Sequence, residues 1–217
     1  NVVFPDADIG NAVKGACAGI FAASGQTCIA GSRLLLHESI AERFLEGFLA
    51  LARGARLGDP MDPSTEVGPI TTRQQYERVL GHIDRARADG AEVILGGGPS
   101  IRPECGTGWF VEPTVFAGVT PDMAIAQAEV FGPVLAVMTF HDEDEAVALA
   151  NGTEYGLAAG VWTRDLARAH RMAARLQAGS VWVNTYRTSA PQAPFGGYRR
   201  SGLGREGGQA AIEQFLE

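Results

Sequence analysis

The sequence has 217 residues, 46% of them apolar and 20% charged, and a formal net charge of −7. This composition is typical of a globular protein long enough to bury a sizeable core. The acidic balance, without a basic cluster, argues against nucleic acid or an anionic membrane surface as a partner, and no stretch has the pattern of a signal peptide or a membrane span.

Patterns of helix and strand alternate along the first half of the chain. Apolar residues recur at helical spacing in the first predicted helix, and Cys17 lies in that stripe, so we predict that its thiol packs in the core. The predicted elements are, in order, a helix capped by Asp6 or Asp8 and running to about Ala23, a buried strand over 29–36, a helix opened by a capping box at 39–42, a turn-rich loop over 57–69, a helix opened by a second capping box at 72–75, and a short strand over 91–95.

The second half continues this alternation. A strand-like run over 110–116 is interrupted by Pro113, which predicts an edge strand or a bulge. Further strands are predicted over 134–140, 157–162 and 180–184, and the helices between them are predicted to begin at Asp142 and Thr163. Strands separated by helices predict one compact α/β domain with a largely parallel, right-handed sheet flanked by helices.

The cysteines and histidines do not suggest a metal site. Cys17, Cys28 and Cys105 are an odd number of cysteines at no ligand spacing, which predicts reduced thiols and a cytoplasmic location. None of the four histidines pairs with a cysteine or an acid at ligand spacing, so we predict no metal. Cys105 falls in an irregular stretch, where we expect an exposed thiol without a role.

Cys28 lies between the first predicted helix and the first predicted strand, in the stretch Ser24-Gly25-Gln26-Thr27-Cys28-Ile29-Ala30. Gly25 allows the chain to leave the helix in a sharp turn, and a residue at such a junction can lie at the edge of the sheet where ligands bind in open α/β folds. A catalytic cysteine must be activated, because a free thiol has a pKa of about 8.5. The alternative is a small buried thiol without chemistry.

Two other stretches have candidate binding functions. Gly202-Leu203-Gly204-Arg205-Glu206-Gly207 matches the dinucleotide fingerprint, but no strand leads into it and the chain ends before the expected acidic residue, so we reject it. Glu129 and Phe131 point the same way from an extended chain. A carboxylate can bind ribose hydroxyls and a ring can press on a flat heterocycle, whereas the alternative is a simple turn before a strand.

Together these motifs resemble the catalytic domain of the NAD(P)-dependent aldehyde dehydrogenase superfamily, and they cover nearly all of residues 1–217. The matching segments are Gly25–Cys28 with Gly31–Arg33, Gly58–Pro60, Val67–Pro69, Gly108–Thr114, Glu129–Val134, Asn151–Leu157, Val181–Asn184, Pro194–Tyr198 and Ser201–Glu206. No single segment is specific, but their combination and order are.

The resemblance implies a chemical role for Cys28 and three cofactor contacts. Cys28 matches the nucleophile that attacks an aldehyde to give a thiohemiacetal, whose hydride passes to NAD or NADP and whose thioester is then hydrolysed. Its backbone N–H is expected to help hold the oxyanion. Glu129 matches the residue that binds the nicotinamide ribose, Phe131 the ring beside it, and Gln75 a position that reaches the adenosine ribose.

The resemblance also implies how a small-molecule aldehyde is held. Thr27 and Ile29 flank the nucleophile and are expected to touch substrate, and Phe195 matches an aromatic residue of the aldehyde tunnel. Arg187 lies in the tunnel-lining loop, where it either favours an acidic aldehyde or points to solvent. The parent enzyme is expected to be a homodimer or homotetramer.

Several parts of the family pattern are missing from this sequence. The motif with the general-base glutamate is expected just before Asn1, and the cofactor-binding domain, the second oxyanion donor and the final oligomerisation strand, expected after Glu217, are also absent. We therefore expect a catalytic-domain segment that is inactive as a dehydrogenase by itself. A cysteine hydrolase or thioesterase, which needs a histidine beside Cys28, and a non-catalytic interaction domain with an inert thiol remain alternatives. NAD against NADP, and water against coenzyme A as the acyl acceptor, stay open.

Overall fold

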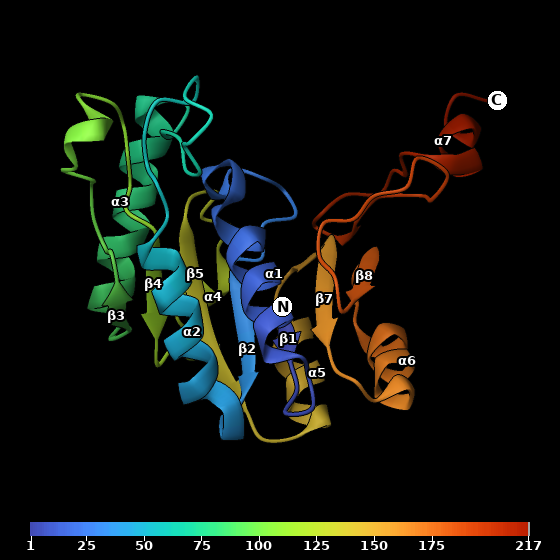
Figure 1. Ribbon diagram of the computed structural model, residues 1–217. Coiled ribbons are helices and arrows are strands. Elements are labelled where there is room, and N and C mark those ends of the chain that lie inside the picture. Colours follow the sequence, from blue (N-terminus) through green and yellow to red (C-terminus); the bar gives the residue numbers. More distant parts are fainter. Residues whose placement is uncertain (217) are drawn as a thin grey trace.

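The computed structural model describes residues 1–216, which form a seven-stranded sheet flanked by helices (Figure 1). The strands are β1 (Val2–Val3), β2 (Arg33–His37), β3 (Glu92–Leu95), β4 (Thr114–Ala117), β5 (Val134–Phe140), β6 (Tyr155–Gly156), β7 (Ala158–Trp162), β8 (Ser180–Val183) and β9 (Tyr198–Arg199). The helices are α1 (Ile9–Phe21), α2 (Ala41–Arg53), α3 (Arg73–Ala88), α4 (Ala124–Gln127), α5 (Glu143–Asn151), α6 (Leu166–Arg175) and α7 (Gly208–Glu213), with 3₁₀ turns η1 (Ala22–Gly25), η2 (Glu38–Ile40) and η3 (Pro103–Cys105).

The main sheet has the strand order β3-β4-β5-β2-β1-β7-β8, and β6 and β9 form a separate antiparallel pair. Within the main sheet only β3 and β4 pair antiparallel, and every other neighbouring pair is parallel. The prediction of an α/β fold with a largely parallel sheet is confirmed. Parallel strands need helical crossovers, and these place a helical layer on each face.

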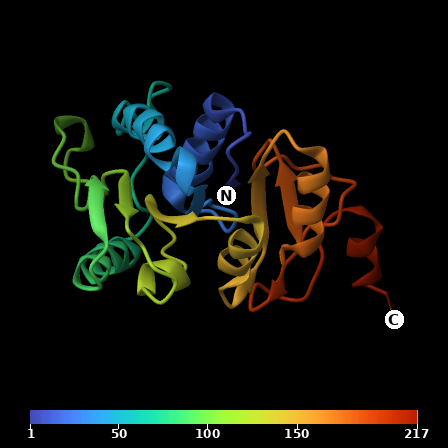
Figure 2. The same cartoon turned by 90° about the horizontal axis from the view of Figure 1, so that it is seen from below.

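Side chains that alternate along the central strands separate two cores. Leu34 and Leu36 of β2 pack with α1 and α2, whereas Leu35 packs in the core that contains buried residues of α3, α4, α5 and α6. Figure 2 shows α1 and α2 on one side of the sheet and α3, α4 and α5 on the other. Both faces of β2 are therefore buried, which explains its continuous Leu-Leu-Leu run.

The structure corrects three predicted boundaries near the chain's first strands. Residues 29–32 are not part of a strand; β2 begins only at Arg33, because Cys28 and Ile29 form a turn. The capping box at 39–42 is wrong, since α2 begins at Ala41 without a side-chain cap and the ring of His37 accepts the N–H of Ser39 instead. The run over 110–116 becomes β4 only after Pro113, and β4 is an inner strand between β3 and β5.

The helix predicted to begin at Thr163 begins at Leu166, with Asp165 as its cap. The caps at Asp8, Thr72 and Asp142 are confirmed by side-chain hydrogen bonds to backbone N–H groups. Asp6, the alternative cap for α1, has another partner: its carboxylate accepts hydrogen bonds around the end of β7. The sequence pattern could not separate these because both acids precede the same apolar stripe.

The thiols of Cys17 and Cys105 are both buried. Burial raises the pKa of Cys17 to about 11, and the charge of Glu66 adds to that rise. The prediction for Cys105 is wrong: the residue is only 4% exposed, and its sulfur lies 3.3 Å from the hydroxyl oxygen of Ser100. The loop that holds Cys105 folds over the α1–α2 core, where Phe110 and Val115 are buried beside it.

The chain after β8 leaves the sheet as an extended arm, and α7 projects away from the other helices at its end (Figure 1). No residue of α7 is buried, and the arm exposes apolar side chains at Leu203, Ile212 and Phe215. Within residues 1–216, none of the helices has both the length and the apolar character that crossing a membrane requires.

Candidate active site

The candidate site lies at the amino edge of the sheet, where the parallel strands β2, β5, β7 and β8 begin. Cys28 precedes β2, Glu129 precedes β5, and Leu157 and Ala178 precede β7 and β8; all four line one cleft of about 380 Å³. In Figure 1 the arrowheads of β2 and β7 point downward, so this edge is uppermost. The expected position at the ligand-binding edge of an open α/β sheet is therefore wrong, because that edge is the carboxyl one.

The Cys28 turn, residues 24–31, is fixed at both of its ends. Ser24 donates its hydroxyl hydrogen to the carbonyl of Gly68 at 2.8 Å, and the Gly31 N–H donates to Gly19 of α1 at 3.0 Å. The Ala30 N–H closes the turn on the carbonyl of Thr27 at 2.9 Å. Cys28 is exposed at the top of this turn, so the alternative of a buried thiol does not hold.

Gly25 brings the Cys28 turn against a second loop, the Glu129 loop of residues 129–133. Its φ is +69°, in the left-handed region, and a Cβ added there would overlap the carbonyl oxygen of Gly132. Glycine is the residue that satisfies both conditions. The nucleophile candidate and the cofactor candidates therefore lie on two loops whose backbones touch.

Glu129 and Phe131 face outward from the Glu129 loop. Glu129 is exposed, and within residues 1–216 its carboxylate has no hydrogen bond or ion pair. Phe131 has a φ of +54°, which is uncommon for a bulky residue, and its side chain is 37% exposed. The side-chain amide of Gln75 donates to the carbonyls of Val130 and Phe131 at 2.9 and 3.1 Å, so Gln75 holds the loop that carries both candidates.

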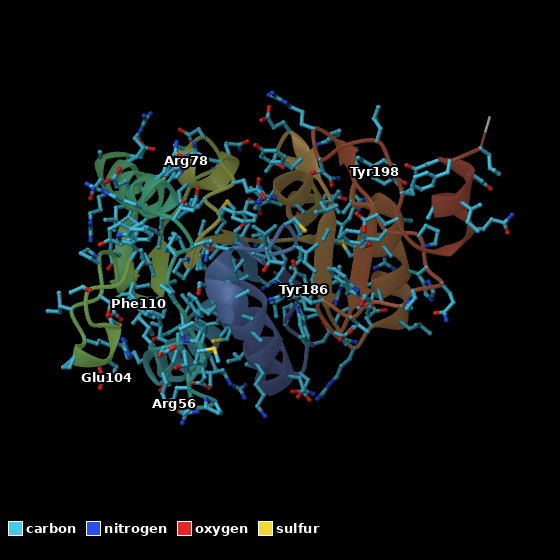
Figure 3. All side chains as sticks on the ribbon, turned by 90° about the horizontal axis from the view of Figure 1, so that it is seen from above. Arg56, Arg78, Glu104, Phe110, Tyr186 and Tyr198 are labelled. Atoms are coloured by element: carbon cyan, nitrogen blue, oxygen red, sulfur yellow. The ribbon has the colours of Figure 1, made fainter. Side chains whose placement is uncertain are left out.

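Tyr186 connects the chain after β8 to the Cys28 turn. Its hydroxyl donates to the carbonyl of Ile29 at 3.0 Å, and burial raises the pKa of this phenol well above its ordinary value, so it stays protonated. The ring lies against two glycines: an added Cβ would come within 2.9 Å of it at Gly19 and 2.7 Å at Gly160. Figure 3 shows Tyr186 between α1 and the β7–β8 side of the sheet.

Arg187 follows Tyr186 and approaches the residue before the cysteine. One of its guanidinium nitrogens lies 3.5 Å from the hydroxyl oxygen of Thr27. Arg187 therefore lies against the Cys28 turn, and a preference for an acidic aldehyde stays a prediction. Of the predicted substrate residues, Ile29 lines the cleft, whereas Thr27 and Arg187 lie beside it. Phe195 is placed apart, because it pairs with Glu206 in the arm.

The cleft also contains a residue that the sequence did not single out. Arg33, at the start of β2, donates to the carbonyls of Leu149 and Ala150 at 3.0 and 2.7 Å in the last turn of α5. Burial lowers its pKa to about 10, so it stays cationic at neutral pH, where it complements the negative end of the helix dipole. An arginine beside three leucines was the available signal, because a buried charge needs partners.

The chemistry of the cleft fits a cysteine nucleophile better than a metal or a catalytic triad. No group of three His, Cys, Asp or Glu side chains in residues 1–216 could hold a metal ion. No histidine lines the cleft, and the ring nitrogens of His37 and His141 bind Ser39 and Glu38 after strand β2. The arrangement required for a Cys–His hydrolase is therefore not present among the described residues.

Comparison with known proteins agrees with this geometry. The model of the aldehyde dehydrogenase family matches residues 1–217. Betaine aldehyde dehydrogenase of Brucella anthropi is 46% identical over 216 residues, which is 100% of this chain and 44% of that protein. The chain thus spans less than half the length of such curated relatives.

Solved structures give the same result. PnpE from Pseudomonas sp. WBC-3, in complex with nicotinamide adenine dinucleotide, is 50% identical with a TM-score of 0.98, and the match covers 100% of this chain and 44% of PnpE. The NAD⁺ complex of aldehyde dehydrogenase from Bacillus cereus is 42% identical with a TM-score of 0.96, over 100% and 43% of the two chains. The chain belongs to the aldehyde dehydrogenase family.

Proposed function

We propose that residues 1–217 are the catalytic domain of a longer enzyme, here called the full-length protein, that oxidises an aldehyde to a carboxylic acid with NAD or NADP. The observation that carries this proposal is the exposed Cys28 on a turn whose backbone contacts the Glu129 loop. A nucleophile and a cofactor-binding surface must be adjacent for a hydride to pass between substrate and cofactor.

In the proposed reaction the Cys28 thiolate bonds to the aldehyde carbon, and the carbonyl oxygen becomes an oxyanion. The backbone N–H of Cys28 has no acceptor among the described residues, so it is free to donate to that oxygen. After a hydride leaves the same carbon, a thioester links the acyl group to Cys28. Attack by water on the thioester carbon releases the acid and returns the thiol.

The described residues suit the nicotinamide end of the cofactor, which accepts the hydride when bound. The unpartnered carboxylate of Glu129 can accept hydrogen bonds from two ribose hydroxyls. Phe131 presents an exposed aromatic face near it. Gln75 keeps the two carbonyls of this loop in place, and we propose that it acts on cofactor binding through the loop and reaches the adenosine ribose from its position on α3.

We propose that the general base and the second oxyanion donor come from parts of the full-length protein outside residues 1–217. Among the residues that line the cleft, Glu129 is the one carboxylate, and cofactor binding uses it. Residues 1–217 alone are therefore expected to form no NADH. The exposed apolar arm supports a homodimer or homotetramer, and the three unpaired cysteines support a cytoplasmic location.

The test is a dehydrogenase assay of the full-length protein and its Cys28→Ala variant. Aromatic, aliphatic, semialdehyde and betaine aldehyde substrates are each tried with NAD and NADP, betaine aldehyde because it is in the names of curated relatives. We expect NADH or NADPH formation with at least one aldehyde and a loss of at least about 1000-fold in the variant. Activity that survives the substitution would remove the basis of the proposal.

A further inference from the structure

We propose that Arg187 binds a carboxylate of the substrate, so that the enzyme acts on aldehydes that carry a negative charge at their other end. This inference rests on the proposed aldehyde oxidation and adds the substrate class to it. The observation behind it is a guanidinium that the fold directs toward the nucleophile's turn and leaves without a counter-ion.

The charge of Arg187 is not neutralised within the described residues. Thirteen ion pairs occur in residues 1–216, and Arg187 takes part in none of them. Its one polar contact is the 3.5 Å approach to the hydroxyl of Thr27. A guanidinium has five N–H donors in a planar fork, so most of its donors remain available.

The fold holds this side chain in place. Arg187 has a φ of +63°, a left-handed conformation that a long side chain rarely adopts without support. The support comes from both sides: Tyr186 is bonded to Ile29, and the indole N–H of Trp182 donates to the carbonyl of Thr188 at 2.7 Å. The Trp182 and Tyr186 rings also pack edge to face, 5.0 Å apart.

The guanidinium of Arg187 lies close to the residue that precedes the nucleophile. Thr27 directly precedes Cys28, and adjacent Cα atoms are about 3.8 Å apart. An aldehyde carbon bonded to Cys28 and a carboxylate on Arg187 can then belong to one short molecule. A planar fork binds a carboxylate through two parallel hydrogen bonds, whereas a quaternary ammonium is repelled by the same charge.

The remaining arginines near the cleft have other partners. Arg33 is bonded to the end of α5, Arg199 to carbonyls of Asn151 and Thr153, and Arg200 to the carboxylate of Glu154. Arg187 is the guanidinium among these four that keeps free donors, and this singles it out as the anion-binding group.

The experiment compares kcat/KM of the full-length protein for succinic semialdehyde, for butanal, which has the same number of carbons and no charge, and for betaine aldehyde. We expect succinic semialdehyde to be preferred over butanal by about 10- to 100-fold, the range for a hydrogen-bonded charge contact. Arg187→Met should lower the value for succinic semialdehyde by the same factor and leave that for butanal within about 2-fold. Arg187→Lys should lie between the two, because it keeps the charge and loses the fork.

Two further variants make the result decisive. Arg187→Gly fits the positive φ without strain, so it reports the loss of the guanidinium even if Arg187→Met disturbs the loop. Arg43→Met, at an exposed position of α2, controls for the change in net charge and should alter neither substrate. Equal use of succinic semialdehyde and butanal by the unmodified enzyme, or an equal loss for both in the Arg187 variants, would overturn this inference. Failure to oxidise any aldehyde would instead contradict the proposed function.

Discussion

The two edges of the parallel sheet differ in how completely their polar groups are paired. At the carboxyl edge, Asp6 accepts hydrogen bonds from the Thr163 hydroxyl, from the backbone N–H groups of Arg164 and Asp165, and from Arg168 at 2.6 Å. At the amino edge, Cys28, Glu129 and Arg187 have almost no partners among residues 1–216.

This difference indicates that the carboxyl edge stabilises the fold, whereas the amino edge is available to bind ligands. A charged group that is paired on all sides stabilises one conformation, whereas an exposed nucleophile, carboxylate or guanidinium contributes little to stability and is available to a ligand. We therefore expect substitutions at the carboxyl edge to change unfolding and substitutions at the amino edge to change chemistry.

The largest expected effect is in thiol reactivity. Cys28 is exposed, whereas Cys17 and Cys105 are buried, so iodoacetamide should label Cys28 at least about 100-fold faster than the other two in the folded protein. Peptide mapping by mass spectrometry after short exposure measures these rates. The Cys28→Ala variant is the control and should stay unlabelled over the same time. Equal labelling of Cys17 would show that the two cores are not closed.

The next effect is on stability at the carboxyl edge. Asp6→Ala removes the acceptor of four donors, and with it the carboxylate nearest to Arg168, so we expect a loss of about 1 to 3 kcal/mol in the free energy of unfolding. Urea denaturation of the full-length protein measures it. The matched control is Asp144→Ala: that side chain is 83% exposed and pairs only with Arg175 at the surface, so its loss should be below about 1 kcal/mol. Similar losses in the two variants would contradict a special role for the carboxyl edge.

Gly160→Ala tests the link that Tyr186 makes to the Cys28 turn. The added methyl would lie 2.6 Å from the side-chain oxygen of Asn1 and 2.7 Å from the Tyr186 ring, so we expect overpacking to destabilise the fold by about 1 to 3 kcal/mol and to lower activity as the turn shifts. Thermal unfolding and the dehydrogenase assay measure both. Gly81→Ala is the control, because an added Cβ there meets nothing within 4 Å and alanine favours a helix by about 1 kcal/mol. Unchanged stability and activity in Gly160→Ala would show that the position of the Tyr186 ring is not needed for either.

Gln75→Leu should have a smaller effect, confined to cofactor binding. Without its amide the carbonyls of Val130 and Phe131 lose their donor, so we expect the KM for NAD to rise by about 3- to 10-fold with kcat little changed. Gln74→Leu, at the exposed neighbouring position, is the control. A fall in kcat without a rise in KM would place Gln75 in a different role.

The smallest effect is in the dependence of stability on pH. Burial would raise the pKa of Asp6, but hydrogen bonds from Thr163 and from two backbone N–H groups lower it below its ordinary value. A depressed folded pKa gives stability that is complete above the unfolded pKa of about 3.9 and is lost as the pH falls through the lower folded value. The urea midpoint should therefore fall between about pH 5 and pH 3, and Asp6→Ala should reduce this fall. An identical profile in the variant would exclude Asp6 as its source.

Local patterns were enough to predict the parts of the structure that depend on neighbouring residues. The caps at Thr72 and Asp142, the apolar stripe of α1 and the continuous apolar strands follow from spacing of a few residues, and they led to the correct sheet type. The position of Cys28 between a helix and a strand also followed, from Gly25 and the change of pattern around it, but its exposure did not, because the same pattern allowed a buried thiol.

Features made by distant residues were not predictable in this way. The burial of Cys105 depends on a loop that folds over a core made by α1 and α2. The acceptor role of Asp6 depends on residues more than 150 positions away, and Tyr186 enters a slot between Gly19 and Gly160 that no local pattern reveals. The prediction of which sheet edge carries the site was wrong, because the general rule for open α/β folds names the carboxyl edge.

The proposed reaction depends on a covalent bond between the Cys28 sulfur and the aldehyde carbon. The most direct measurement is mass spectrometry of the full-length protein, mixed with NAD and an aldehyde that it oxidises, quenched with acid during the first turnover and digested. We expect an acyl group on the peptide that contains Cys28 and none on the peptides of Cys17 or Cys105, with no adduct in Cys28→Ala. An acyl group on another residue, formed together with NADH in the first turnover, would contradict this role of Cys28. So would the absence of any adduct if Cys28→Ala also kept full activity.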